Sequence, residues 1–171
     1  MRSNTFPSIH ALNVTALSGR TFSMSEYTGK VLLIVNTASK CGHTYQLGLL
    51  EELYQEYKDR GLVVIGFPSD QFAQEPLNGE QIQEHCQVNY GVTFPMMAKS
   101  KVRGDEANAV FKFFSSKSLN GKFSKQPRWN FYKFLVGRNG EALDHFWTYR
   151  KPNNAALRKA IERALMATNP K

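Results

Sequence analysis

Cys41 is the residue whose position most directly indicates chemistry. It lies in the stretch NTASKCGHTYQ (36–46), just after the apolar run VLLIV (31–35). A cysteine at the first turn after a strand lies near a helix N-terminus, where unpaired N–H groups and the helix dipole favour the thiolate. Because the thiolate is the nucleophile, this position favours redox or acyl chemistry, and Lys40 adds positive potential beside it. The structural alternative is a small buried hydrophobic residue.

Cys86 is the second of the two cysteines in the chain. Two cysteines form neither the disulfide framework of a small secreted domain nor a cysteine-rich zinc site. The four histidines have no metal-ligand spacing either. We therefore expect no metal and no cofactor. Cys86 is then either a buried free thiol or the partner of a reactive Cys41.

Amide and indole side chains offer hydrogen-bond donors that suit a thiolate. Gln71 and Gln74 follow the apolar run LVVIGFP (62–68), and open α/β sheets bind ligands beyond the carboxyl ends of their parallel strands. Trp129 and Asn130 open a later strand pattern. The amide and indole N–H groups of these four side chains can donate hydrogen bonds to a thiolate without supplying a counter-charge. Taken alone, Trp129 and Asn130 are more typical of a core tryptophan and a turn asparagine.

The pattern of apolar residues predicts an α/β fold around these positions. Continuous apolar runs are typical of buried strands, and apolar residues three to four positions apart are typical of helices. The expected strands are 31–38, 62–68, 131–137 and 142–149, and the expected helices are 47–60, 78–91, 106–116 and 153–166. The first two strands should be parallel because a helix joins them, and an Asn-Gly turn should join the last two as an antiparallel hairpin. The sequence therefore predicts a central mixed sheet with helices on both faces.

Length and composition predict one domain, residues 1–171, with a 42% hydrophobic content that argues against disorder. Residues 1–98 carry six Lys/Arg against nine Asp/Glu (net −3), and residues 99–171 carry sixteen against five (net +11). The basic residues are scattered and no nucleic-acid motif is visible, so we expect a solvated basic face and no nucleic-acid partner.

No apolar run is long enough to span a bilayer, and the first residues lack the apolar region of a secretory signal. We therefore expect a cytoplasmic protein without membrane insertion.

Four stretches, taken in sequence order, resemble the motifs of one protein family. They are VLLIVNTASKCG, GFPSDQF followed by QEP, NYGVTFPM and WNFYKFLVGRNG. Together they resemble the glutathione peroxidase family, in the subgroup that has cysteine in place of selenocysteine. The match covers roughly residues 10–166, nearly the whole chain. The resemblance implies a thioredoxin-like fold and the reduction of hydrogen peroxide and of organic or lipid hydroperoxides.

The resemblance also implies catalytic roles for four residues. Cys41 stands at the position of the peroxidatic residue. Trp129 and Asn130 stand on the family's Trp-Asn pair. The family's glutamine lies in the QEP element, which favours Gln74 over Gln71.

Cys86 matches the resolving cysteine of members that resemble thioredoxin-dependent peroxidases. The resemblance then implies that the sulfenic acid of Cys41 condenses with Cys86, and that thioredoxin rather than glutathione reduces the disulfide. A disulfide needs the two Cα atoms within about 7 Å. We therefore expect the helix 78–91 to unwind locally after oxidation, with Gly79 and Gly91 as hinges.

The sequence departs from the family at the start of one motif. The family usually reads FPCNQF, and here Ser69 and Asp70 replace the cysteine and the asparagine. A carboxylate at position 70 that points inward would disfavour a nearby thiolate. The span 115–128 is too short for the long loop of tetrameric relatives, so we expect a monomer.

Other thiol proteins fit the sequence less well. A peroxiredoxin has the pattern P-x-x-x-T-x-x-C, and here Ile34 and Ala38 stand at the first two fixed places. A thiol-disulfide oxidoreductase would need a cysteine at Thr44, and a metal chaperone of this fold would need one at Tyr45. The remaining alternative is a non-catalytic peroxide sensor or relay that passes its disulfide to client proteins.

Overall fold

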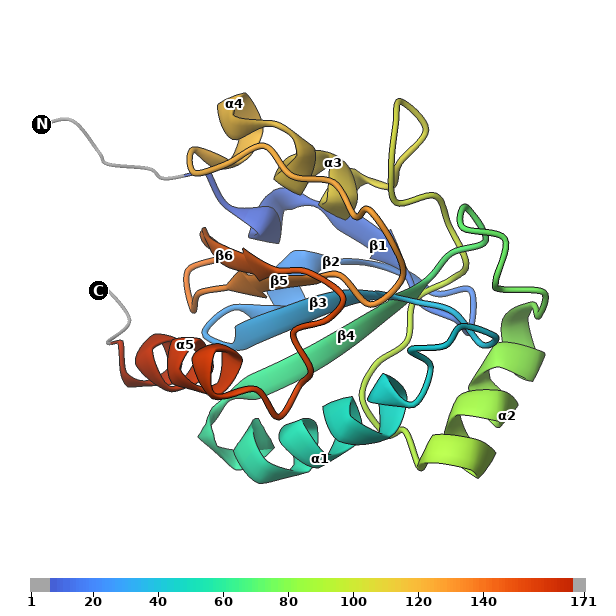
Figure 1. Ribbon diagram of the computed structural model, residues 1–171. Coiled ribbons are helices and arrows are strands. Elements are labelled where there is room, and N and C mark those ends of the chain that lie inside the picture. Colours follow the sequence, from blue (N-terminus) through green and yellow to red (C-terminus); the bar gives the residue numbers. More distant parts are fainter. Residues whose placement is uncertain (1–6, 168–171) are drawn as a thin grey trace, which may run out of the picture.

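The central sheet has four strands in the order β4-β3-β5-β6 (Figure 1). The computed structural model describes residues 7–167. β3 (Val31–Thr37) and β4 (Leu62–Pro68) are parallel. β5 (Lys133–Val136) is antiparallel to β3, and β6 (Ala142–Phe146) is antiparallel to β5. The predicted mixed sheet, with a parallel first pair and an antiparallel hairpin, is confirmed.

Helices cover both faces of this sheet, as predicted (Figure 1). α1 (Gln46–Tyr57) and α5 (Ala155–Met166) lie on one face, and α3 (Ala109–Ser115) lies on the other. α2 (Gly79–Tyr90) lies beside α1, near the end at which β3 and β4 finish. Both strand-to-helix connections that carry candidate site residues therefore emerge at the same end of the sheet.

The apolar run of β3 forms the boundary between two halves of the core. Leu33 and Val35 pack toward α1 and α5, while Leu32 and Ile34 pack toward α3. All four side chains are completely buried. A strand between two helical layers must be apolar on both faces, which is why the run in the sequence is continuous rather than alternating.

Several element boundaries differ from those expected from the sequence. α3 begins at Ala109 rather than at residue 106, because Asn108 caps it: the Asn108 side chain accepts a hydrogen bond from the N–H of Phe111 at 3.0 Å. β6 ends at Phe146, because the next residues turn, with the N–H of Arg150 bound to the carbonyl of Trp147.

Short elements complete the described part of the chain, and the apolar periodicity did not predict them. They are the hairpin of β1 (Asn13–Thr15) and β2 (Thr21–Ser23), α4 (Lys117–Asn120), and the 3₁₀ helices η1 (Ile9–Ala11), η2 (Met24–Tyr27) and η3 (Lys58–Arg60). Elements of three or four residues are too short to show a helical or strand period.

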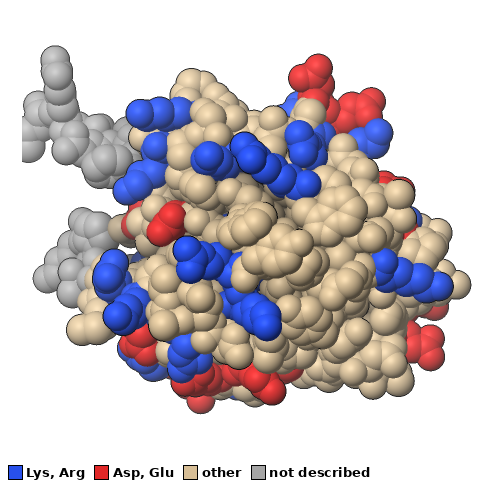
Figure 2. All heavy atoms as spheres, in the orientation of Figure 1, with Lys and Arg blue, Asp and Glu red and all other residues tan. Residues whose placement is uncertain are grey.

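Basic side chains are spread over the face shown in Figure 2, with uncharged residues between them. This distribution matches the scattered lysines and arginines of the second half of the sequence. Within residues 7–167, the structure contains no helix long and apolar enough to cross a membrane.

Candidate active site

Cys41 lies half-buried in the turn that joins β3 to α1. Its N–H donates to Thr44 Oγ1 at 2.8 Å, and Thr44 Oγ1 donates to the carbonyl of Ala38 at 2.9 Å. The N–H of His43 donates to Cys41 Sγ at 3.3 Å, which is the one hydrogen bond to this sulfur among the described residues. The sulfur therefore meets an amide of the turn. The sequence suggested the first amides of the helix, but α1 begins only at Gln46.

The side chains of Gln74 and Asn130 are in direct contact. Asn130 Nδ2 donates to Gln74 Oε1 at 2.9 Å. The main-chain carbonyl of Gln74 accepts a hydrogen bond from the N–H of Lys40 at 3.0 Å, which ties this loop to the residue beside Cys41. Asn130 is completely buried, and its Oδ1 has no partner within residues 7–167. The structure thus brings two of the predicted amides together beside the cysteine turn.

Trp129 lies at the rim of this site rather than in the core. It is 38% exposed, and its ring centroid lies 5.3 Å from that of Phe72. Its main-chain carbonyl accepts a hydrogen bond from Asn36 Nδ2 at 3.0 Å. The core placement that is typical of a lone tryptophan is therefore wrong here.

Gln71 and Asp70 are turned toward other partners. Gln71 Oε1 accepts hydrogen bonds from the N–H groups of Val102 and Arg103, at 2.6 and 2.9 Å. The Asp70 side chain is 57% exposed, and its carboxylate lies 3.7 Å from the ammonium of Lys99. Of the two glutamines, only Gln74 contacts Asn130, and the carboxylate at position 70 does not point inward.

Cys86 is buried in α2, and its thiol is held in the protonated form. Burial and, second, the charge of Glu75 raise the pKa of Cys86 to about 12. Cys41 and Cys86 are both free thiols in this structure, and both contact the apolar cluster beneath α1. The two cysteines therefore differ in exposure: Cys41 is partly exposed, and Cys86 is 2% exposed.

Comparison with known proteins identifies the family of this chain. The family model described as glutathione peroxidase matches residues 9–115. The chain belongs to the glutathione peroxidase family. This confirms the family that the four motifs predicted.

Relatives of this family match almost the whole chain. The glutathione peroxidase-like peroxiredoxin GPX5 of Chlamydomonas reinhardtii is 49% identical over 163 residues, 94% of this chain and 98% of that protein. A crystal structure of Trgpx in apo form is 33% identical and has a TM-score of 0.75, covering 95% of this chain and 99% of that one. A thioredoxin-family thiol:disulfide interchange protein from Chlorobium tepidum has a TM-score of 0.67 at 14% identity, covering 96% and 99% of the two chains. The last similarity concerns the fold alone, and it confirms the predicted thioredoxin-like architecture.

Asn36, at the end of β3, shapes the turn that carries Trp129 and Asn130. Its Nδ2 binds the carbonyl of Trp129, and its Oδ1 accepts the N–H of Tyr132 at 2.9 Å. Its own carbonyl accepts the N–H of Phe131 at 2.7 Å. Phe131 has a φ of +64°, a left-handed conformation that costs a residue other than glycine about 1–2 kcal/mol. The contacts of Asn36 hold this strained turn in place.

Lys133 supports the same turn from the side of α1. Its ammonium is completely buried and donates to the carbonyls of Phe131 at 2.7 Å and of Thr148 at 3.3 Å. Thr148 Oγ1 in turn donates to the carbonyl of Asn130 at 2.7 Å. Gln46 Nε2, at the start of α1, also donates to the carbonyl of Thr148, at 2.8 Å. Burial lowers the pKa of Lys133 to about 7.

Asn36, Lys133 and Thr148 were not predicted from the sequence as residues of the site. The first two carry a detectable signal, because each is a polar residue within or at the end of a strand that is otherwise buried and apolar. A buried polar group must find a partner, so such a residue indicates a specific contact. Thr148 follows the last strand in a turn, where a threonine is ordinary, and nothing in the sequence distinguishes it.

Replacing Asn36 with alanine should destabilise the protein and lower its peroxidase activity. The change leaves the part-buried carbonyl of Trp129 and the buried N–H of Tyr132 without these partners, and a lost partner costs a buried group about 1–3 kcal/mol. Urea denaturation and turnover with hydrogen peroxide measure the two effects. The exposed Asn13→Ala is the control, and an equal loss in both variants would contradict the role of Asn36.

Replacing Lys133 with methionine should change the pH dependence of stability. The pKa of Lys133 is lower in the folded protein than in the unfolded chain, so between about pH 7 and pH 10 the unfolded chain binds more protons. Below pH 7 the folded protein bears the full free-energy cost of burying the charged ammonium. This cost falls as the pH rises and Lys133 loses its proton. The free energy of unfolding of the wild type should therefore rise with pH relative to Lys133→Met.

Urea denaturation from pH 6 to pH 10 measures this difference, because other titrating groups are the same in both proteins. The exposed Lys112→Met should show no such trend. A constant difference between the wild type and Lys133→Met would mean that Lys133 keeps its ordinary pKa.

Proposed function

We propose that the protein is a thiol peroxidase that reduces hydrogen peroxide and organic or lipid hydroperoxides, with Cys41 as the peroxidatic residue. The observation that carries this proposal is the contact of Asn130 with Gln74 beside the turn of Cys41. Membership of the glutathione peroxidase family supports a peroxidase and favours it over the sensor or relay. Cys41 is partly exposed, which is compatible with access of a small peroxide to it.

In the first step the Cys41 thiolate attacks one oxygen of the peroxide. The O–O bond breaks, the second oxygen takes a proton and leaves as water or an alcohol, and Cys41 becomes a sulfenic acid. The amide of Asn130, the amide of Gln74 and the indole of Trp129 are N–H donors that can orient the thiolate and the peroxide. Because none of them is charged, they stabilise the thiolate without pairing it too tightly to react.

In the second step the sulfur of Cys86 attacks the sulfenic acid. A disulfide forms, and the leaving hydroxide takes the thiol proton and departs as water. Burial keeps Cys86 protonated, so its thiol must leave its site before it can react. Ile82 and Cys86 are the buried residues of α2, so few apolar contacts hold this helix in place. Local unwinding of α2 after oxidation, with Gly79 and Gly91 as hinges, would release the Cys86 thiol from its buried site and allow it to approach Cys41.

In the third step a dithiol of the thioredoxin type reduces the disulfide by exchange. A resolving cysteine within the chain favours thioredoxin over glutathione, because the product of resolution is a protein disulfide.

We expect the protein to act as a monomer in the cytoplasm, without a metal or cofactor.

Replacing each cysteine separates the steps of this cycle. Cys41→Ser should abolish turnover in an NADPH-coupled assay with thioredoxin and its reductase. Cys86→Ser should consume about one peroxide per chain and then stop, because the sulfenic acid has no partner for a disulfide. Sustained turnover by Cys41→Ser would refute the assignment, and sustained turnover by Cys86→Ser with thioredoxin would remove the resolving role.

Hydrogen exchange tests the movement of α2. Amides of residues 79–90 should lose protection in the disulfide form relative to the reduced form, while those of β3 and β4 keep theirs. Mass spectrometry of peptides from both forms gives the comparison. Equal protection of α2 in the two forms would show that the cysteines meet without unwinding.

A further inference from the structure

The loop 69–78 connects the two halves of the proposed cycle. It leads from the end of β4 to the start of α2, and it contains Gln74. It ends at Asn78, the N-cap of α2, which is the helix that carries Cys86. Ala73, directly before Gln74, has a φ of +58°, a left-handed conformation that an alanine rarely adopts. This loop needs outside contacts to keep its shape.

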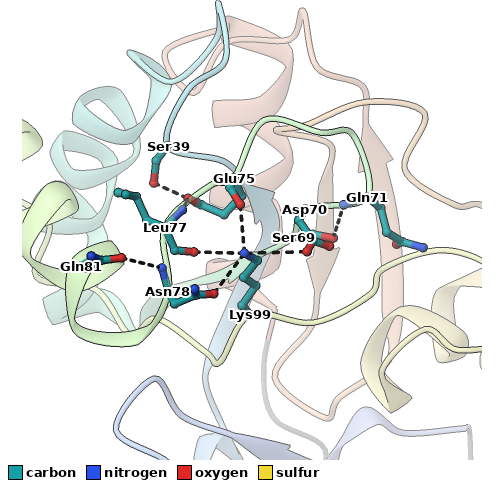
Figure 3. A network of polar contacts seen from close by, with 9 residues as sticks. All are labelled: Ser39, Ser69, Asp70, Gln71, Glu75, Leu77, Asn78, Gln81 and Lys99. Atoms are coloured by element: carbon teal, nitrogen blue, oxygen red, sulfur yellow. Dashed lines mark hydrogen bonds and ion pairs between the residues drawn. The ribbon is translucent and has the colours of Figure 1, made fainter.

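The ammonium of Lys99 supplies such contacts (Figure 3). Lys99 Nζ donates to the carbonyls of Glu75 at 3.0 Å and of Leu77 at 3.1 Å. It also donates to Asn78 Oδ1 at 3.2 Å and lies 3.7 Å from the carboxylate of Asp70. All four partners belong to the loop 69–78, so one charged group holds both ends of it.

The main chain that carries Lys99 is itself fixed to the sheet. The N–H of Met97 donates to the carbonyl of Gly66, and the N–H of Ser100 donates to that of Pro68. Both acceptors belong to β4. Lys99 thus reaches from an irregular segment that is hydrogen-bonded to β4 to a loop outside the sheet, which is the arrangement that a positioning contact requires.

A second contact continues this network to the turn of Cys41. The carboxylate of Glu75 accepts a hydrogen bond from Ser39 Oγ at 2.8 Å, and its other oxygen accepts the N–H of Leu77 at 3.3 Å. Figure 3 shows the Glu75 carboxylate directed toward Ser39, while its main-chain carbonyl faces Lys99. A shift of the loop at Lys99 would therefore change the contact of Ser39, two residues before Cys41.

We propose that Lys99 is a positioning residue that acts on both chemical steps: it holds Gln74 in place for the oxidation of Cys41, and it restrains the start of α2 and so delays the approach of Cys86. This inference rests on the proposed peroxidase cycle. The contacts to Leu77 and Asn78 must break before α2 can unwind from its N-terminus. The contact to Glu75 is next to Gln74, so it supports the amide that faces Asn130.

The proposal predicts opposite effects on the two steps when Lys99 is replaced by methionine. The second-order rate of Cys41 oxidation by hydrogen peroxide should fall about tenfold, because hydrogen bonds to a charged group are lost from the loop that carries Gln74. This rate is measured in a Cys86→Ser background by quenching with a sulfenic-acid reagent and mass spectrometry. With Cys86 present, the first-order rate of disulfide formation should rise severalfold. A purely structural lysine would slow both steps or neither.

Asn78→Ala tests the second effect at an exposed residue. It removes one contact of Lys99 and the N-cap of α2, and leaves the contact to Glu75 intact. Disulfide formation should be faster, and the oxidation of Cys41 should keep the wild-type rate. This variant keeps the proposal testable if Lys99→Met does not fold.

Lys101→Met is the matched control, because Lys101 lies two residues away in an exposed ion pair with Glu106. Both of its rates should equal those of the wild type. Wild-type rates in Lys99→Met, or slower disulfide formation in Asn78→Ala, would overturn the role of Lys99 while the peroxidase cycle stands. A wild-type protein that forms no disulfide between Cys41 and Cys86 would refute the proposed cycle, and the inference with it.

Discussion

The hydrogen bond from Asn130 to Gln74 is the constraint on which the candidate site depends. It joins two loops that are far apart in sequence and leave the sheet at the same end. Neither amide has a fixed position by itself, because each lies in an irregular segment. The bond orients both, and the N–H of Lys40 then ties the pair to the turn of Cys41. The relative position of the three candidate loops is thus set by contacts between them, and the sheet supplies only their starting points.

Each loop is held by a specific polar side chain. Asn36, in β3, holds the turn of residues 129–132 through three of its own polar groups. Lys99, fixed beside β4, holds the loop 69–78. Thr44 closes the turn of Cys41 from within. This design allows strained residues such as Phe131 and Ala73 to persist where the chemistry is expected, because their surroundings determine their conformation.

The sheet and its main helices could be predicted from the sequence because their signals are local. The runs 31–35 and 62–68 are apolar without interruption, and the helices show a period of three to four residues. The start of α3 was misplaced because the cap at Asn108 outweighs the helix preference of the residues before it. The candidate site was predicted by family resemblance, since the contact of residues 74 and 130 has no local signal. The roles of Asn36 and Lys99 depend on which backbone groups lie opposite them, and this is known only once the loops are placed.

The two lysines beside the site show how the protein satisfies irregular backbone. Lys133 and Lys99 each bind two main-chain carbonyls of irregular segments. An ammonium has three donors and no acceptor, so it can satisfy several carbonyls at one point, which a neutral side chain cannot do as strongly. The cost in free energy comes from the removal of a charge from water. It is large for Lys133, whose pKa is lowered by burial to about 7. No carboxylate among residues 7–167 bonds to this ammonium to offset the cost. Lys99 stays partly exposed and has Asp70 nearby, so the same type of contact is cheaper there and easier to break. The difference fits their positions: Lys133 supports a turn that must stay fixed, whereas Lys99 holds a loop that must release a helix during the proposed cycle.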